Sequence, residues 1–313
     1  MKSYFYPWEN GEKHNVECVL ALGFFDGVHA AHRELILSAK AAAKKLGLPL
    51  GIFTFRTGTA IKSAVRRLYG EDEKLELFES LGADFVISAD FDKIKDISPE
   101  DFVKANLYSD IGCILCVAGF NFRFGRGAQG DADMLTRLMR ECGGDALIKN
   151  ELKIDGETVS ATGIRALIEH GEIERANELL GAPYFLCGAV EHGRSVGTEL
   201  GFPTVNMELG DDRVPLKRGV YRSAVMIDGK LYNALTNIGT CPTFDERREH
   251  AETYILDFSG DLYGRRLRVY LLGFLREEKR FESAGELAEQ IKQDIKEAKN
   301  RNGETKWQVL GQS

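Results

Sequence analysis

A buried strand followed by a tight turn and two histidines constrains the N-terminal half of this chain more than any other stretch. Residues 18–25 are almost wholly apolar, and the Asp-Gly pair at 26–27 follows them as a turn signal. His29 and His32 come next, at the start of a helical pattern of apolar residues that ends at Gly47. Since the first turn of a helix offers unpaired N–H groups and the positive end of a dipole, this segment predicts a phosphate site. From the spacing alone, a chance pair of histidines on a solvated first turn explains the pattern equally well.

Strand and helix patterns alternate through the first half of the chain. Short apolar runs at 50–55, 85–88, 113–118 and 146–149 are typical of buried strands, and helical patterns separate them. One of these helices begins with a serine N-cap followed by proline, at 98–99. The alternation predicts an α/β fold, a doubly wound parallel sheet whose ligand binds at the carboxyl ends of the strands.

A glycine-rich loop, residues 119–131, follows the strand at 113–118 and opens a helix. Its three phenylalanines, at positions 120, 122 and 124, are more apolar than a plain surface turn requires. Because the loop lies past a strand end, it is a candidate for the wall of a ligand site. A flexible surface turn is the alternative.

Further along, Ser160 and Thr162 are placed to cap a helix that begins near Gly163, and Arg165 falls on its first turn. This combination of hydroxyls, a helix N-terminus and a permanently charged guanidinium is suited to binding polyphosphate. Helix capping alone also explains the two hydroxyls.

The pattern changes after residue 182, where we place the boundary between a domain of residues 1–182 and one of residues 183–313. Beyond it the apolar runs are short, rich in β-formers and divided by glycine turns, with Asp228-Gly229 typical of a hairpin. These features predict a small antiparallel β-barrel. A terminal helix that begins at a capping box, residues 283–286, should pack on the barrel through an apolar stripe of Leu287, Ile291 and Ile295.

The barrel half contains a second candidate phosphate site in residues 192–206. Glycines at four-residue intervals suit a loop whose backbone N–H groups cradle phosphates. A hydroxyl and an amide two residues apart, on one side of an extended segment, suit a metal–phosphate site. The residues concerned are Gly193, Gly197, Gly201, Pro203, Thr204 and Asn206.

Composition narrows the classes of function. The 313 residues suit two domains, and 43% hydrophobic with 28% charged residues is typical of a soluble globular protein. No apolar run approaches membrane-spanning length and the first residues lack the apolar core of a signal peptide, so we expect a cytoplasmic protein without a membrane partner. A formal net charge of −7 argues against nonspecific binding to nucleic acid.

The six cysteines are scattered along the chain. Cys113 and Cys116 form a C-x-x-C pair, but a metal site needs a second such pair or suitably spaced histidines, and the sequence has neither. We therefore expect buried thiols at these two positions and no tightly bound metal cluster.

The segment GFFDGVHAAH at 23–32 resembles the H-x-G-H element of the nucleotidyltransferase superfamily, in the form found in bacterial bifunctional riboflavin kinase/FAD synthetases. Residues 119–131 resemble the G-x-[DN]-F-R-F-G…G-D element of the same family, and VSATGIR at 159–165 resembles I-S-S-T-x-I-R. The resemblance implies that His29, His32 and Arg165 serve the reaction. It also implies that nucleotide and flavin contact Gly23, Phe24, Asp26, Asn121, Phe122, Phe124, Ser160 and Thr162.

In the barrel half, HGRSVGTELGFPTVN at 192–206 resembles the riboflavin kinase signature G-x-x-x-G-x-x-L-G-[FW]-P-T-x-N, and the segment starting at Asn237 matches N-I-G-x-x-P-T-F. The resemblance implies that the glycines, Pro203 and Asn237 contact the ligands and that Thr204 and Asn206 bind Mg²⁺ and ATP phosphate. It also implies that Glu252 is the base that takes the proton from the riboflavin 5′-hydroxyl. Without these signatures, Glu252 would be interpreted as an ordinary strand carboxylate on a solvated face.

The resemblance implies a bifunctional transferase that phosphorylates riboflavin to FMN with ATP and Mg²⁺ and then adenylylates FMN to FAD. Its expected partners are riboflavin, FMN, FAD and ATP, with the chain a monomer or weak homo-oligomer. Three departures are visible in the first half of the chain: Ala31 and Ala161 replace a glycine and a serine of the patterns, and residues 56–59 read RTGT where the family has an acidic or Pro-His-Pro loop. In the kinase signature, Thr198 stands where the family often has arginine. Three alternatives therefore stay open. They are a riboflavin kinase with a degenerate adenylyltransferase half, a non-catalytic flavin-binding regulatory protein, and a nucleotidyltransferase with another acceptor.

Overall fold

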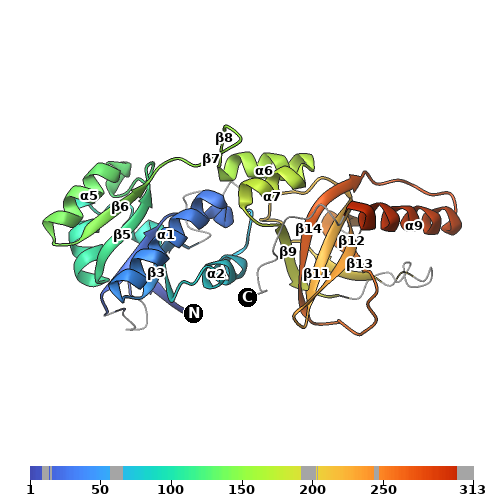
Figure 1. The fold of residues 1–313 in the computed structure, drawn as a ribbon, viewed down its shortest axis with the longest axis horizontal. Coiled ribbons are helices and arrows are strands. Elements are labelled where there is room, and N and C mark those ends of the chain that lie inside the picture. The colour runs from blue at the N-terminus through green and yellow to red at the C-terminus, as the bar shows by residue number, and fades with distance from the viewer. Residues whose placement is uncertain are drawn as a thin grey trace. The chain divides into compact units, whose positions relative to one another are not determined.

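The chain divides into two compact units, Met1–Ser160 and Ala161–Ser313 (Figure 1). The predicted order, a parallel α/β sheet followed by an antiparallel barrel, is confirmed. The boundary predicted after residue 182 stays a prediction, and helices α6 (Ala161–His170) and α7 (Ile173–Leu180) fall in the second unit. The computed structural model describes residues 1–8, 14, 16–56, 66–191, 202, 204–242 and 247–301.

The first unit is a six-stranded parallel sheet in the order β1-β4-β3-β2-β5-β6, connected by helices. Its strands are β1 Lys2–Tyr6, β2 Cys18–Leu22, β3 Leu50–Phe55, β4 Phe85–Ala89, β5 Cys113–Gly119 and β6 Asp145–Lys149, with a small hairpin of β7 Lys153–Ile154 and β8 Glu157–Thr158. Its helical segments are η1 Asp26–Val28, α1 Ala30–Leu46, α2 Glu71–Ser80, α3 Phe91–Ile94, α4 Pro99–Asp101, η2 Phe102–Asp110, η3 Arg126–Ala128 and α5 Ala132–Glu141.

The strand order of this sheet reverses at β2, whose two neighbours are β3 on one side and β5 on the other. All five residues of β2 are buried, and Ala21 pairs with Val117, so the carboxyl ends of β2 and β5 lie side by side. In open α/β sheets, ligands bind in the crevice where the strand order reverses. The topology therefore points to the segments that follow β2 and β5.

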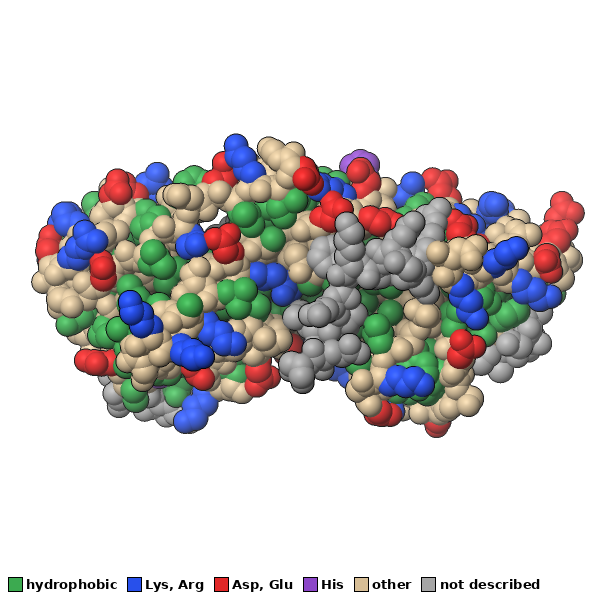
Figure 2. All heavy atoms as spheres, viewed as in Figure 1, with side chains coloured by type: hydrophobic (Ala, Val, Ile, Leu, Met, Phe, Trp, Pro, Cys, Tyr) green, Lys and Arg blue, Asp and Glu red, His purple; other side chains and the backbone are tan. Residues whose placement is uncertain are grey.

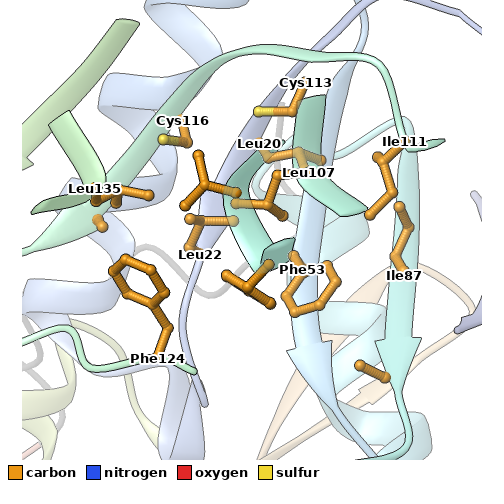
Figure 3. Packing of buried hydrophobic residues seen from close by; sticks show 14 of the residues in the cluster. Leu20, Leu22, Phe53, Ile87, Leu107, Ile111, Cys113, Cys116, Phe124 and Leu135 are labelled. Atoms are coloured by element: carbon orange, nitrogen blue, oxygen red, sulfur yellow. The ribbon is translucent and has the colours of Figure 1, made fainter. Parts of the chain in front are cut away.

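Helices cover both faces of the parallel sheet. On one face, residues of β2 such as Leu20 and Leu22 pack with η2 and α5 in a cluster that also holds Phe124 (Figure 3). Helix α1 packs against β2, β3 and β5 with buried residues that do not belong to this cluster, so it covers the other face. Cys113 and Cys116 lie in the cluster as free buried thiols, which confirms the expectation for this pair.

The second unit contains a six-stranded antiparallel sheet in the order β10-β13-β12-β11-β14-β9. Its edges meet at an antiparallel bridge in which the Glu191 N–H donates to the Asn206 carbonyl at 2.8 Å, so the sheet curls into a small barrel. The predicted hairpin is confirmed, with Asp228 and Gly229 joining paired residues Ile227 and Lys230. The elements are β9 Tyr184–Ala189, β10 Thr204–Glu208, β11 Gly219–Ile227, β12 Lys230–Pro242, β13 Arg247–Ile255, β14 Arg266–Arg276 and helix α9 Ala284–Arg301.

Helix α9 begins and packs nearly as predicted. The Ser283 hydroxyl accepts a hydrogen bond from the Glu286 N–H at 3.2 Å, and the Glu286 carboxylate accepts one from the Glu282 N–H at 3.1 Å. The reciprocal bond therefore reaches one residue further back than a standard capping box. Ile295 packs against a buried cluster in which Ala298 of the same helix meets Val220, Leu235 and Leu256 of the barrel.

One sequence-based expectation needs correction, and one strand was not predicted. Helix α6 begins at Ala161 rather than near Gly163, so Thr162 lies inside its first turn and Ser160 alone precedes it. Ala161 is a strong helix former, and the glycine is tolerated inside the helix. Strand β1 was not predicted, because it is a short edge strand and β4, its partner among the described residues, lies far along the chain.

Within the residues that the structure describes, none of the helices is both long and apolar enough to cross a membrane. On the face shown in Figure 2, basic and acidic side chains are interspersed among apolar ones. This mixture agrees with the modest formal net charge of −7.

Asn177 ties α7 to the barrel and gives a test of this packing. It is fully buried, donates from Nδ2 to the Leu271 carbonyl at 2.9 Å and accepts from the Tyr184 N–H at 2.7 Å. Asn177→Leu leaves both backbone groups buried without a partner, so we expect the free energy of unfolding to fall by about 2–4 kcal/mol in denaturant titrations. Glu178→Leu, at an exposed position of the same helix, should change it by about 0.5 kcal/mol or less. Equal effects of the two substitutions would contradict this account.

Candidate active sites

The first candidate site begins at the carboxyl end of β2. The Gly23 N–H donates to the Phe53 carbonyl at 3.1 Å, and a Cβ at Gly23 would lie only 3.0 Å from the Phe25 ring. Phe25 adopts a left-handed backbone conformation with φ of 51°, which turns the chain sharply after the strand. The Thr54 hydroxyl donates to the Phe24 carbonyl at 3.1 Å, which joins this turn to the end of β3. Asp26 follows and is buried.

His29 and His32 meet at the start of α1. His29 is the N-cap residue, one position before the helix, and its Nδ1 accepts a hydrogen bond from the His32 N–H at 3.4 Å. The two rings stack with centroids 3.6 Å apart and planes 15° apart. The prediction that the two histidines lie together at a helix start is therefore confirmed, with His29 as a cap rather than a first-turn residue.

The protonation state of His29 follows from its burial. The side chain is 6% exposed, and desolvation lowers its pKa from 6.5 to about 4, opposed by a backbone hydrogen bond. The imidazole is therefore neutral near pH 7. Because Nδ1 accepts a hydrogen bond, Nε2 carries the proton and is the available donor.

The loop after β5 comes to the same edge of the sheet. Asn121 is exposed just past the end of β5, next to the end of β2, while Phe122 is half-buried. Phe124 is buried in the core and lies 5.4 Å from the ring of Phe102. Arg126 donates twice to the Asp96 carbonyl, at 3.0 and 2.8 Å, so the loop is pinned to the domain rather than being a free turn. A ligand contact by these side chains stays a prediction.

Ser160, Thr162 and Arg165 are split between the two compact units. Ser160 is the last residue of the first unit, whereas Thr162 and Arg165 lie on α6 in the second. Arg165 Nη2 donates to the Thr162 hydroxyl at 3.2 Å, so the structure brings these two together. Their part in the site at α1 stays a prediction.

The second candidate site lies on one face of the barrel sheet. Glu252 on β13 pairs with Asn206 on β10 and with Asn237 on β12, so the three side chains form a row across adjacent strands. Thr204, two residues before Asn206, points to the same face, and its hydroxyl donates to Glu252 Oε1 at 2.7 Å. The prediction that Thr204 and Asn206 share one side of an extended segment is confirmed.

A cavity of about 330 Å³ opens on this face, between the sheet and α9. It has a polar end, formed by Thr204, Glu252 and Asn237, and a wall that is largely apolar and aromatic. A small number of convergent polar groups in an apolar pocket is typical of a small-molecule site. The remaining lining residues are Phe202, Val220, Leu235, Tyr254, Arg276, Glu278, Lys279, Phe281, Leu287, Ile291 and Asp294.

An ion pair holds α9 over this cavity. Arg276 on β14 donates to both carboxylate oxygens of Asp294 on α9, at 3.0 and 2.8 Å, and the Asp294 side chain is 4% exposed. Gln290 donates to the same carboxylate at 2.9 Å. This ion pair was not predicted from the sequence. The signal was Asp294 itself, a carboxylate beside Ile291 and Ile295 on an apolar helix stripe, which requires a cationic partner.

The polar end of the cavity suits a hard cation that shares its coordination with phosphate. Among the described residues, no group of three or more His, Cys, Asp or Glu could hold a metal ion alone. The Thr204 hydroxyl, Glu252 carboxylate and Asn237 amide nevertheless supply the oxygen donors that Mg²⁺ uses together with substrate phosphates. Four of the residues predicted for this site, Gly193, Gly197, Gly201 and Pro203, lie outside the described residues.

Comparison with known proteins identifies the family of each half of the chain. Residues 11–163 match the family model described as FAD synthetase, and residues 180–302 match the one described as riboflavin kinase. Proteins named bifunctional riboflavin kinase/FMN adenylyltransferase from Bacillus subtilis and Escherichia coli K12 are 31% and 34% identical to this chain. Each alignment covers 92% of this chain, and 93% and 94% of the respective relatives.

A crystal structure described as a macrolide-efflux protein from Streptococcus pneumoniae has the same architecture over nearly the whole length. Its TM-score is 0.84 at 28% identity, and the match covers 96% of this chain and 99% of that one. The chain therefore belongs to the family of bifunctional riboflavin kinase/FMN adenylyltransferases.

Proposed function

We propose that this chain makes FAD in two steps. The barrel transfers the γ-phosphoryl group of ATP to the 5′-hydroxyl of riboflavin, and the parallel-sheet unit joins the resulting FMN to the AMP part of a second ATP with release of pyrophosphate. The observation that carries the proposal is the Thr204–Glu252 hydrogen bond at the polar end of the barrel cavity, in a chain of this family.

In the barrel, Glu252 is the general base. Its carboxylate already accepts a hydrogen bond from one hydroxyl, that of Thr204 at 2.7 Å, and the riboflavin hydroxyl would bind at the same polar end and give up its proton there. The apolar wall takes the flavin ring, and Asn237 orients the polar tail. Mg²⁺, bound with ATP through the oxygens of Thr204 and Asn206, would offset the charge on the transferred phosphoryl group.

In the parallel-sheet unit, the phosphate of FMN is itself the nucleophile, so no protein base is required. The task of the site is to position two phosphate groups and to stabilise negative charge. The neutral His29 offers a donor at Nε2, and α1 directs its free N–H groups to the same place. His32 stacks on His29 and fixes its ring. We propose that the polyphosphate is also bound by Ser160, Thr162 and Arg165.

Separation of the flavins after incubation of the full chain with riboflavin, ATP and Mg²⁺ tests the proposal directly. We expect FMN first and FAD later, with one pyrophosphate released for each FAD. Accumulation of FMN alone would identify a kinase with a degenerate adenylyltransferase half. Binding of flavin without either product would identify a non-catalytic protein, and transfer of labelled AMP to another acceptor would identify a different nucleotidyltransferase.

Substitution of Glu252 separates the two activities. Glu252→Gln keeps the shape of the side chain but removes the base, so we expect kcat for FMN formation to fall about 10²- to 10⁴-fold. FAD formation from supplied FMN should be unchanged. Asp257→Asn, the same chemical change at an exposed position just after β13, should leave both rates at their original values. Undiminished FMN formation by Glu252→Gln would rule out this carboxylate as the base.

Burial of neutral His29 predicts a pH dependence of stability. Its pKa is about 4 in the folded chain against 6.5 ordinarily, so the unfolded chain binds the proton more tightly. The contribution of this group to stability is full above pH 6.5 and is lost as the pH falls towards 4, by about 3 kcal/mol. Denaturant titrations between pH 7 and 4, followed by tryptophan fluorescence, should show a steeper fall in the free energy of unfolding for the wild type than for His29→Gln. Parallel pH profiles would contradict the assignment.

A further inference from the structure

Helix α2 carries a buried lysine that neither proposed reaction uses. Lys74 is 3% exposed, and among the described residues none forms a hydrogen bond or a close ion pair with its ammonium group. Burial lowers its pKa, the carboxylates of Glu71 and Asp26 oppose that shift, and Arg67 adds to it. Lys74 also stands one turn from the start of α2, at the positive end of the helix dipole. Burial, Arg67 and the helix dipole each make a positive charge at this position less favourable in the free protein, and the two carboxylates offset only part of that effect.

The position of Lys74 is fixed by the start of its own helix. The Glu73 carboxylate accepts a hydrogen bond from the Gly70 N–H at 2.6 Å, and the Lys74 N–H donates to the Gly70 carbonyl at 3.0 Å. One turn further on, Phe78 packs against Phe25 with ring centroids 5.6 Å apart. Residues four apart share a helix face, so Lys74 and Phe78 both face the turn that follows β2.

That turn belongs to the first candidate site. The Lys74 ammonium lies 5.8 Å from the centre of the Phe24 ring, and the Phe24 carbonyl is bonded to Thr54 at the end of β3. Phe25 contacts His32 edge to face, with centroids 5.2 Å apart. The buried charge therefore sits beside the carboxyl ends of β2 and β3, next to the segment that leads to the N-terminus of α1.

We propose that Lys74 binds the polyphosphate of ATP in the first site, from α2, as a cationic group additional to the histidines at α1. A buried ammonium whose neighbouring carboxylates form no hydrogen bond or close ion pair with it gains from a further anion, and a nucleoside triphosphate supplies one at this edge of the sheet. The inference rests on the proposed adenylyl transfer for its substrate. The competing interpretation is that Lys74 serves only as a counter-ion for Asp26 and Glu71.

The two interpretations differ in what Lys74→Met does to stability. If Lys74 binds the polyphosphate, Lys74→Met lowers kcat/KM for ATP in FAD formation about 10- to 100-fold. The melting temperature of the ligand-free protein then stays the same or rises. Lys74→Arg keeps the charge and should recover at least part of the loss. FMN formation by the barrel should stay unchanged in both variants, and Lys95→Met, which removes an exposed lysine of the same unit, should change neither reaction. A lowered melting temperature with an unchanged kcat/KM would establish the counter-ion role and overturn the proposal.

Binding of inorganic pyrophosphate separates this inference from the proposed function. Calorimetric titration of the full chain with pyrophosphate should show 10- to 100-fold weaker binding by Lys74→Met than by the wild type, whether or not the chain makes FAD. If FAD never forms but this difference appears, the proposed function fails and the role of Lys74 stands. Equal affinities, or no pyrophosphate binding by either protein, would overturn the role of Lys74.

Discussion

The first site depends on the parallel pairing of β2 with β5. This pairing joins two segments that are far apart in the sequence, the turn after β2 and the loop after β5, at one edge of the sheet. Local hydrogen bonds hold each segment there. In the turn after β2 the Gly23 N–H donates to the Phe53 carbonyl, and in the loop after β5 the Arg126 side chain donates to the Asp96 carbonyl. The topology sets the place of the site, and these contacts set the direction in which its side chains point.

In the barrel, strand register has the corresponding role. Glu252 faces the cavity because β13 pairs with β10 and β12 in a register that places it opposite Asn206 and Asn237. Its neighbour Thr253 points to the opposite face, where its hydroxyl lies 3.0 Å from that of Thr236 in a buried hydrogen-bonded row. A slip of one residue would exchange the two faces, burying a carboxylate and exposing a hydroxyl. The same register therefore serves the stability of the barrel and the chemistry of the cavity.

Much of this arrangement follows from local sequence signals, and the rest does not. The turn at Asp228-Gly229, the cap at Ser283 and the histidines at a helix start depend on neighbours a few residues away, so their patterns predicted them. The Arg276–Asp294 ion pair and the burial of Lys74 depend on how distant segments pack, which no local pattern encodes. Strand β1 was not predicted for the same reason, because it depends on pairing with the distant strand β4.

The two sites differ in how their buried charges are neutralised. In the barrel, Arg276 and Asp294 neutralise each other, so α9 keeps its place over the cavity without any ligand. In the first unit, Lys74 forms no such bonded pair among the described residues; the carboxylates of Glu71 and Asp26 offset only part of the cost of its burial, and we propose that a bound anion offsets more. A ligand that binds only the folded state stabilises that state. On the proposed role of Lys74, polyphosphate binding and the stability of the first unit are therefore linked, whereas the ion pair over the barrel cavity involves two groups of the chain itself.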